Sequence, residues 1–214
     1  WIKVIPYYKS VSKHLLPIYD KPMIYYSISV LMLAGIKDIL IICDKYNRPS
    51  FKQLLGDGSN FGLNIKFKTQ DKPDGIASAI VLGQDFIKKD KLCLILGDNI
   101  FYGQDFQSKL TKAVNSERGA NIFAYKVADP ENYGIINSNK KNIPVSIIEK
   151  PSKPKSNWAV TGLYFYDNSV VKKAKGLKKS KRGEYEISDI NNQYLKNGDL
   201  DIQYFGRGFA WLDT

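Results

Sequence analysis

The chain has 214 residues, of which 43% are hydrophobic and 25% are charged, and its formal net charge is +11. This length is sufficient for one sizeable domain, and the composition is that of a folded globular protein rather than of a disordered or collagen-like chain. The longest apolar stretch, residues 23–36, is interrupted by serines and is too short to cross a bilayer, and no short basic leader precedes it. We therefore expect a cytoplasmic protein that has no membrane partner.

The distribution of charge and of reactive side chains excludes several further classes of protein. Lysines are scattered along the chain with one denser patch at 172–182, and the aromatic residues mostly fall inside apolar runs, so we expect no nucleic-acid partner. A small anionic substrate accounts for some of the cations equally well. Cys43 and Cys93 each lie in an apolar run and indicate neither a disulfide nor a metal motif. The single histidine, His14, cannot form a catalytic triad or a zinc site by itself.

Helix and strand patterns alternate along the first half of the chain. Asp20 can cap a helix that stops at Gly35, and the continuous apolar run at 37–43 is typical of a parallel strand covered on both faces. The elements expected next are a helix at 51–55, a strand at 63–67, a helix at 76–87, a strand at 92–96, a helix at 105–114 and a strand at 121–127. This order predicts a layered α/β fold with a mostly parallel sheet.

The second half of the chain is richer in strand patterns. The expected elements are strands at 145–148, 159–166, 201–205 and 209–212 and a helix at 187–195, and we expect the strands to extend the same sheet and to form one wall of a cleft. No linker interrupts the chain, so we expect a single domain over residues 1–214. Ligands of such sheets bind beyond the carboxyl ends of the strands, which makes the residues after each apolar run the candidates for a site.

Two acidic residues stand at the ends of expected strands. Asp98 follows the run at 92–96 through Gly97, and Asp213 ends the last run of the chain. Mg²⁺ prefers oxygen ligands and often takes only one or two protein carboxylates together with substrate phosphates. The two residues are therefore candidate metal ligands, although an Asx turn explains the segment around Asp98 equally well.

Three other loop segments contain groups that suit an anionic or a pyrimidine ligand. Glu149 and Lys150 precede a proline, which we expect to end the strand so that both side chains turn toward the cleft. Arg182, at the end of the basic patch, has the planar guanidinium that suits phosphate. Gln70 can pair with a pyrimidine edge, and Gly75 lets a base lie against the backbone. A surface ion pair and an ordinary loop are the alternatives for the first and third segments.

Six segments taken together resemble the glucose-1-phosphate thymidylyltransferases, a family of sugar nucleotidylyltransferases, in that family's order. They are SKHLLPIYDKPM at 12–23, LLGDGS at 54–59, LGDNIFYG at 96–103, EKP at 149–151, VTGLYFYD at 160–167 and WLDT at 211–214. The resemblance covers essentially the whole chain and implies a layered, Rossmann-like nucleotidyltransferase fold with a mixed, mostly parallel central sheet. It also implies Mg²⁺-dependent, in-line transfer from dTTP to α-D-glucose 1-phosphate, which gives dTDP-glucose and pyrophosphate. Such chemistry requires positioning and charge neutralisation rather than a protein nucleophile.

The resemblance also implies roles for individual residues. The metal ligands are Asp98 and Asp213, and the residues implied in catalysis are Lys13, Asp98, Lys150, Arg182 and Asp213. The residues implied in nucleotide binding are Lys3, Lys13, Gln70, Gly75 and Asp98. The residues implied in binding the sugar and its phosphate are Asn99, Tyr133, Gly134, Glu149, Lys150, Val160 and Arg182.

The first residues depart from the family pattern. The family begins with a strand and a Gly-Gly-x-Gly-Thr-Arg-Leu loop, and Trp1, Ile2 and Lys3 align where Gly-Thr-Arg stands. Lysine keeps the charge of arginine but loses its planar fork, and tryptophan crowds a tight loop. We therefore expect a core domain truncated at both ends, lacking the first strand and the glycine-rich loop, that is inactive or feeble as written. The homo-oligomer of the family is doubtful for such a fragment.

Other functions stay open on the sequence alone. A sister enzyme that uses UTP or CTP differs only in the base, and a pocket discriminates one methyl group by only about 1–3 kcal/mol. A non-catalytic subunit that binds a nucleotide sugar is favoured by the unusual first residues. A metal-dependent glycosyltransferase shares the layered sheet, but its usual Asp-x-Asp motif is not found at an expected strand end.

Overall fold

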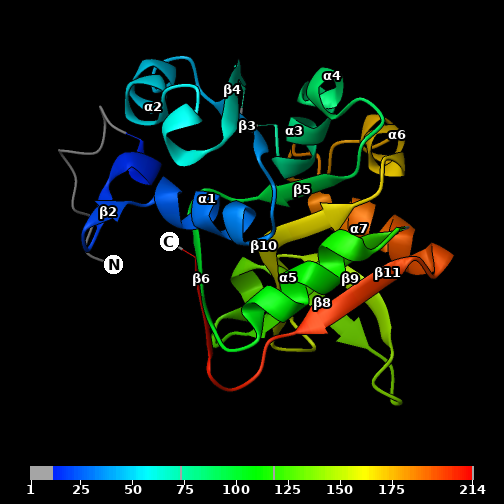
Figure 1. The fold of residues 1–214 in the computed structure, drawn as a ribbon. Helices are drawn as coiled ribbons and strands as arrows, with labels where there is room; N and C mark the ends of the chain where they lie inside the picture. Colours follow the sequence, from blue (N-terminus) through cyan, green and yellow to red (C-terminus); the bar gives the residue numbers. More distant parts are fainter. Residues whose placement is uncertain (1–11, 73, 118, 214) are drawn as a thin grey trace.

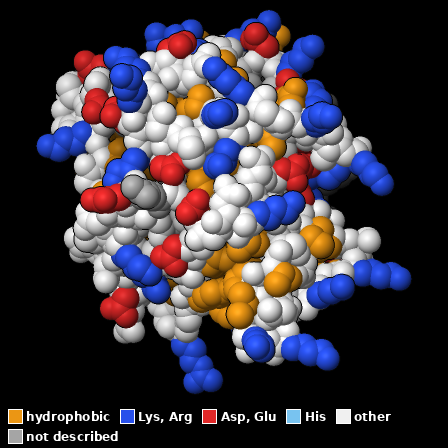
Figure 2. Space-filling model, turned by 90° about the vertical axis from the view of Figure 1, so that its right-hand side faces the viewer, with side chains coloured by type: hydrophobic (Ala, Val, Ile, Leu, Met, Phe, Trp, Pro, Cys, Tyr) orange, Lys and Arg blue, Asp and Glu red, His pale blue; other side chains and the backbone are white. Residues whose placement is uncertain are grey.

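The computed structural model describes residues 12–72, 74–117 and 119–213 (Figure 1). The predictions for Trp1, Ile2 and Lys3 therefore lie outside the described residues. Within the described residues, no helix combines the length and the apolar character needed to span a membrane. Figure 2 shows Lys and Arg side chains dispersed over one face and interspersed with acidic ones, without a continuous basic stripe on that face.

The first half of the chain alternates helices and strands largely as the sequence predicts. Its elements are η2 Lys13–Leu15, β1 Pro17–Ile18, β2 Lys21–Pro22, α1 Ile24–Leu33, β3 Asp38–Cys43, α2 Arg48–Leu55, η3 Ser59–Phe61, β4 Asn64–Thr69, α3 Ile76–Leu82, α4 Gln84–Ile87, β5 Leu92–Ile95, β6 Asn99–Gly103, α5 Phe106–Asn115 and β7 Ala120–Lys126. Gly35 ends α1 in the left-handed region, as expected (φ 75°). The predicted cap at Asp20 is wrong, because the helix begins three residues later, after Met23. Gly83 divides the helix expected at 76–87 in two.

The second half supplies most of the remaining strands. Its elements are η4 Pro130–Asn132, β8 Gly134–Ser138, β9 Pro144–Glu149, β10 Trp158–Tyr166, α6 Ser169–Lys175, α7 Ile187–Asn197, β11 Leu200–Tyr204 and β12 Phe209–Asp213. The sequence patterns missed β6, β8 and α6. The last strand, β12, does not extend the main sheet as expected but forms an antiparallel ribbon with β6.

The main sheet is mixed, and β10 is its central strand. Its order is β11-β7-β10-β8-β9, and β5 pairs with β10 as a further strand. The strand β10 is antiparallel to β5 and to β7, whereas β11 is parallel to β7. Four strands, β5, β7, β8 and β11, therefore share one direction, because β8 is also antiparallel to β10. This confirms the predicted α/β fold with a mixed sheet.

Side chains alternate between two apolar layers on the faces of this sheet. In β7, Ile122 and Ala124 face a layer that contains residues of α3, α6 and α7, whereas Phe123 faces a layer that contains residues of α5 and of the β6–β12 ribbon. All three side chains are completely buried. Because the strand is covered on both sides, its sequence is a continuous apolar run rather than an alternating one.

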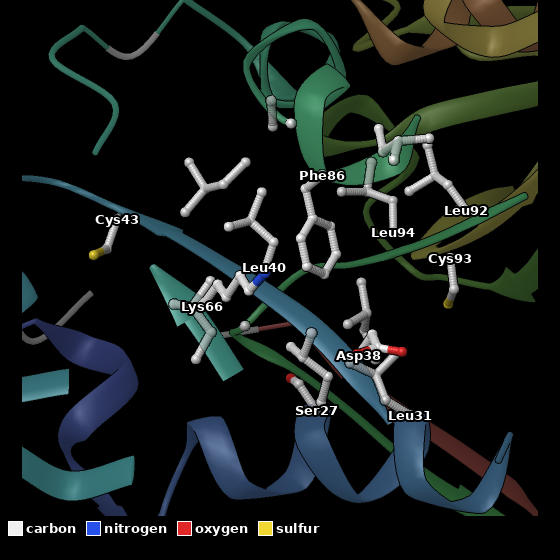
Figure 3. A pocket seen from close by; sticks show the side chains of 18 of the residues that line it. Ser27, Leu31, Asp38, Leu40, Cys43, Lys66, Phe86, Leu92, Cys93 and Leu94 are labelled. Carbon is white, nitrogen blue, oxygen red and sulfur yellow. The ribbon is translucent and has the colours of Figure 1, made fainter. Parts of the chain in front are cut away.

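A cavity of about 1060 Å³ separates β5 from the parallel pair of β3 and β4. Successive residues of β3 and of β5 line it, so the cavity runs along the edges of the two strands rather than over their faces. Figure 3 shows Leu40 of β3, Phe86 of α4 and Leu94 of β5 around this space. Among the described residues, no strand pairs with β3 or β5 across the gap.

Candidate functional site

A second cavity, of about 220 Å³, brings together most of the residues singled out from the sequence. Nine of them line it: Asp98, Asn99, Tyr133, Gly134, Glu149, Lys150, Val160, Arg182 and Asp213. Eight of them lie at or near the ends of β5, β6, β8, β9, β10 and β12, and Arg182 comes from the segment between α6 and α7. The structure therefore places the candidate residues at a common site beyond the strand ends.

The two candidate metal ligands converge on one side-chain amide. The Asn99 Nδ2 group donates to Asp98 Oδ1 at 3.1 Å and to Asp213 Oδ1 at 2.9 Å. The ribbon of β6 and β12 causes this meeting, because its register sets Asp213 directly opposite Asn99. Two carboxylates far apart in the sequence thus point to the same place.

Lys13 reaches this pair of acids from the first helical turn. Its Nζ group lies in hydrogen-bond contact with Asp98 Oδ2. The neighbouring His14 is held locally, since its Nδ1 atom pairs with Ser12 Oγ at 2.9 Å. The His14 ring also leaves no space for a side chain at position 97, because a Cβ atom on Gly97 would lie only 2.8 Å from the imidazole Cδ2 atom.

The electrostatics of the acid pair suit a cation. Partial burial raises the pKa of Asp213 above its ordinary value, and the nearby charge of Asp98 raises it further. A cation between the two would offset that repulsion. Among the described residues there is no cluster of three or more His, Cys, Asp or Glu ligands. Two carboxylates nevertheless fit Mg²⁺, which commonly takes few protein ligands and completes its shell with water and phosphate oxygens.

Glu149 and Lys150 turn into the same cavity at the end of β9. Lys150 adopts a left-handed backbone conformation (φ 41°), which breaks the alternation of β9 and lets both residues line the cavity. Burial raises the pKa of Glu149, and the hydrogen bond donated by Ser188 Oγ to its Oε2 atom partly offsets the effect. Gly134 lies opposite Glu149, and a Cβ atom there would come within 3.1 Å of the same carboxylate.

Arg182 is held between acidic groups at this end of the cavity. Its Nη1 atom lies 3.3 Å from Glu186 Oε1 and 3.9 Å from Glu149 Oε1, and its Nη2 atom lies 3.3 Å from Glu184 Oε1. Glu186 is almost completely buried and also accepts a 2.7 Å hydrogen bond from Ser180 Oγ. The guanidinium is therefore fixed in orientation at the wall of the cavity.

The two residues that the resemblance assigns to nucleotide-base binding, Gln70 and Gly75, do not line this smaller cavity. Gln70 follows β4 and lines the larger cavity, where its Nε2 atom donates to Ser78 Oγ at 2.8 Å. Gly75 precedes α3 with φ 96°, and a Cβ atom there would lie 2.6 Å from the Tyr185 carbonyl oxygen. The glycine is thus required for packing against the segment that follows Arg182.

Four residues of the site were not assigned a role from the sequence. Trp211 Nε1 donates to Asn99 Oδ1 at 2.7 Å and Gly162 N donates to the same atom at 2.9 Å, while Ser188 and Glu186 hold Glu149 and Arg182. Trp211 and Gly162 belong to motifs that carry the resemblance, and membership of those motifs is a sequence signal that indicates a place in the site. Nothing in the segment around Ser188 indicates that helix α7 brings it to β9.

Comparison with known proteins shows the family of the chain. The sequence model of the nucleotidyl transferase family matches residues 3–214. A glucose-1-phosphate thymidylyltransferase of Neisseria meningitidis is 57% identical to this chain, over 99% of the chain and 74% of that protein. One from Mycobacterium tuberculosis is 51% identical, over 99% of the chain and 73% of that protein.

Solved structures give the same result for the fold. A Bacillus anthracis protein described as a glucose-1-phosphate thymidylyltransferase, in complex with sucrose, superposes with a TM-score of 0.89 at 41% identity, over 98% of this chain and 84% of that one. A UDP-glucose pyrophosphorylase with UDP-glucose bound has a TM-score of 0.83 at 23% identity, over 98% of this chain and 88% of that one, a likeness of fold alone. The fold is that of a nucleotidyltransferase. The chain belongs to the glucose-1-phosphate thymidylyltransferase family within that class.

Proposed function

We propose that the protein transfers a thymidylyl group from dTTP to α-D-glucose 1-phosphate, giving dTDP-glucose and pyrophosphate. The observation that carries the proposal is the meeting of Asp98 and Asp213 on one amide, in a cavity whose wall also presents Lys150 and Arg182. Acids that can hold a cation, together with cations that can hold phosphates, suit direct displacement at phosphorus. Relatives at 51–57% identity bear the matching name.

The proposed reaction is an in-line displacement without a covalent enzyme intermediate. An oxygen of the sugar phosphate attacks the α-phosphorus of dTTP, the bond from that phosphorus to the bridging oxygen breaks, and pyrophosphate leaves with the electron pair. Lys13, which contacts Asp98, would neutralise charge on the nucleotide phosphates. Lys150 and Arg182 would hold the attacking phosphate, and Lys3, outside the described residues, is a further candidate for the triphosphate. The role of these cations is to fix the reacting groups and offset their repulsion.

Mg²⁺ is the metal that the donor set fits best. Asp98 and Asp213 would hold it, and when bound it supplies charge neutralisation at the α-phosphate. The contribution of the chain is to present two hard oxygen donors at a fixed spacing through Asn99.

Another part of the cavity lining suits a sugar. The Glu149 carboxylate can accept hydrogen bonds from glucose hydroxyls, and Ser188 fixes its orientation. Tyr133, Gly134 and Val160 complete the wall, with the glycine leaving space beside the carboxylate. We propose that the sugar lies here with its phosphate toward Lys150 and Arg182.

The base would lie near Gln70 and Gly75, outside the smaller cavity. Gln70 has donor and acceptor groups that pair with a pyrimidine edge. Thymine and uracil differ by only one methyl group. The proposed preference for dTTP is therefore supported by the names of the relatives rather than by the residues of the pocket. We also propose that residues 1–214 act as one nucleotidyltransferase core domain in the cytoplasm, on small-molecule substrates and without a nucleic-acid or membrane partner.

A pyrophosphate-release assay with glucose 1-phosphate and dTTP, UTP or CTP tests the proposal. We expect release to be fastest with dTTP and to stop when a chelator removes divalent cations. A faster rate with UTP or CTP would favour the sister enzyme, and binding of dTDP-glucose without release would favour the non-catalytic subunit.

The assay also tests the first three residues. The sequence predicts a feeble enzyme because Trp1, Ile2 and Lys3 stand where the family has Gly-Thr-Arg. We expect the combined change Trp1→Gly, Ile2→Thr and Lys3→Arg to increase the rate. The faster of the two backgrounds then serves for every kinetic comparison below.

A further inference from the structure

Asn99 uses the full hydrogen-bonding capacity of its side chain inside the protein. Its exposed fraction is 0%. A carboxamide offers two N–H donors and one oxygen with two lone pairs. Both donors go to Asp98 and Asp213, and the oxygen accepts from Trp211 Nε1 at 2.7 Å and from Gly162 N at 2.9 Å. The side chain has no group left for a sugar, the role that the resemblance implied.

The two donors on the oxygen side fix which way the amide points. A carboxamide rotated by half a turn would place its NH₂ group against the N–H groups of Trp211 and Gly162, and its oxygen against two carboxylates. Both contacts would be repulsive, so only the observed orientation satisfies all five groups. Gly162 must be glycine for this arrangement, because a Cβ atom there would lie 2.5 Å from Asn99 Oδ1.

We infer that Asn99, anchored by Trp211, is a positioning residue that presets Asp98 and Asp213 for a single divalent cation. The inference rests on the proposed function and adds to it the device that assembles the metal site. The two Oδ1 atoms lie 3.1 and 2.9 Å from one nitrogen, so their separation cannot exceed 6.0 Å. Mg²⁺ binds oxygen at about 2.0–2.1 Å, so a small inward movement brings both atoms onto one ion.

A neutral amide is suited to this task. It adds no charge, so it aligns the two acids without offsetting the negative potential that attracts a cation. Without it, repulsion between the carboxylates would favour side-chain rotamers that point apart. Residues that orient metal ligands in this way usually change metal affinity or activity by about 10–100-fold when they are replaced.

The test is Mn²⁺ binding, followed by the electron paramagnetic resonance signal of free Mn²⁺, with and without dTTP. Asn99→Leu removes both donors while keeping the approximate volume, and we expect it to weaken Mn²⁺ binding at least tenfold. Trp211→Phe keeps the aromatic packing against Tyr133 but removes the anchoring N–H group, and we expect a loss of about threefold. Circular dichroism checks that each variant is folded.

Tyr125→Phe is the matched control. Tyr125 also packs edge-on against Trp211, but its hydroxyl donates to the Phe209 carbonyl and not to Asn99. Removing that hydroxyl deletes one hydrogen bond from the same aromatic group, and we expect Mn²⁺ affinity to stay at the wild-type value.

Wild-type affinity in a folded Asn99→Leu variant would overturn the inference alone. If that variant does not fold, the Trp211→Phe variant decides, and unchanged affinity there overturns the inference as well. If the Tyr125→Phe control loses as much Mn²⁺ affinity as Trp211→Phe, the effect of Trp211 on metal binding does not act through Asn99. A wild-type protein that binds no Mn²⁺ in either condition would overturn the proposed metal site and the inference with it.

Discussion

The two ends of the smaller cavity both hold acids, but the donor between the acids differs. At one end the neutral amide of Asn99 lies between Asp98 and Asp213. At the other end the guanidinium of Arg182 lies 3.3 Å from Glu186 and 3.9 Å from Glu149. A neutral amide thus bridges the acids in one place, beside the ion pair of Asp98 with Lys13, and a guanidinium bridges them in the other.

This difference explains why we assign a metal to one end and a sugar phosphate to the other. The amide adds no positive charge, and Lys13, which pairs with Asp98, offsets one of the two negative charges, so the remaining charge can attract a cation. Acids beside a guanidinium hold that cation in a fixed orientation, and one of them, Glu149, is also bound by Ser188. Arg182 can then present its planar group to a phosphate, and Glu149 can accept from hydroxyl groups.

The largest effect should come from removing one acid of the Asn99 pair. Asp213→Asn keeps the size of the side chain but removes a metal ligand, so we expect the turnover number to fall about 100-fold or more. The measurement is steady-state pyrophosphate release at saturating dTTP and glucose 1-phosphate. A decrease of less than threefold would mean that the two ends do not differ in the way described.

A smaller effect is expected at the opposite end from Arg182→Lys. Lysine keeps the charge but cannot form a planar, bidentate contact with phosphate. We expect KM for glucose 1-phosphate to increase about tenfold, which corresponds to about 1.4 kcal/mol, while KM for dTTP changes little. An increase confined to KM for dTTP would place Arg182 on the nucleotide instead.

A third change separates stability from function at Glu149. Its pKa in the folded protein is raised above the ordinary value of 4.5, chiefly by burial, so the charged carboxylate destabilises the fold at neutral pH. That cost is present above the raised pKa and disappears as the pH falls toward 4.5. We expect Glu149→Gln to increase the melting temperature at pH 7, and to increase it less at pH 5, while raising KM for glucose 1-phosphate.

Thermal melts of wild type and Glu149→Gln across this pH range, with the kinetics measured beside them, check the prediction. A variant that is less stable than wild type at pH 7 would contradict it. In that case the hydrogen bond from Ser188 contributes more than the burial of the charge costs.

The smallest effect is expected from a carboxylate outside the cavity. Asp201 in β11 forms a largely exposed ion pair with Lys112 at 2.9 Å. Asp201→Asn makes the same chemical change as Asp213→Asn, but exposed pairs contribute only about 0–1 kcal/mol. We expect unchanged kinetics, as measured in the same assay. A large kinetic defect would show that loss of any carboxylate impairs the enzyme.

Local patterns predicted the order of elements and most members of the site. The apolar runs at β3, β5 and β10 are continuous because both faces are covered, and such runs are visible in a sequence. The acids Asp98 and Asp213 stand out because each follows such a run. The motifs that carry the resemblance contain six of the nine candidate residues that line the cavity, all but Tyr133, Gly134 and Arg182.

Features that depend on contacts distant in sequence could not be predicted. The strand β6 is short and exists because β12 pairs with it from the other end of the chain. The orientation of Asn99 depends on Trp211 and Gly162 together, and neither neighbours it in sequence. Likewise the positive φ of Lys150, and not the proline alone, turns Glu149 and Lys150 into the cavity.

The most direct test of the central claim is the Mg²⁺ dependence of pyrophosphate release in wild type and Asp213→Asn. The account predicts a saturable requirement for Mg²⁺ in wild type. In the variant it predicts a rate at least about 100-fold lower that recovers, if at all, only at higher Mg²⁺. Equal rates with the same Mg²⁺ dependence in both proteins would contradict the claim that Asp98 and Asp213 jointly hold the metal.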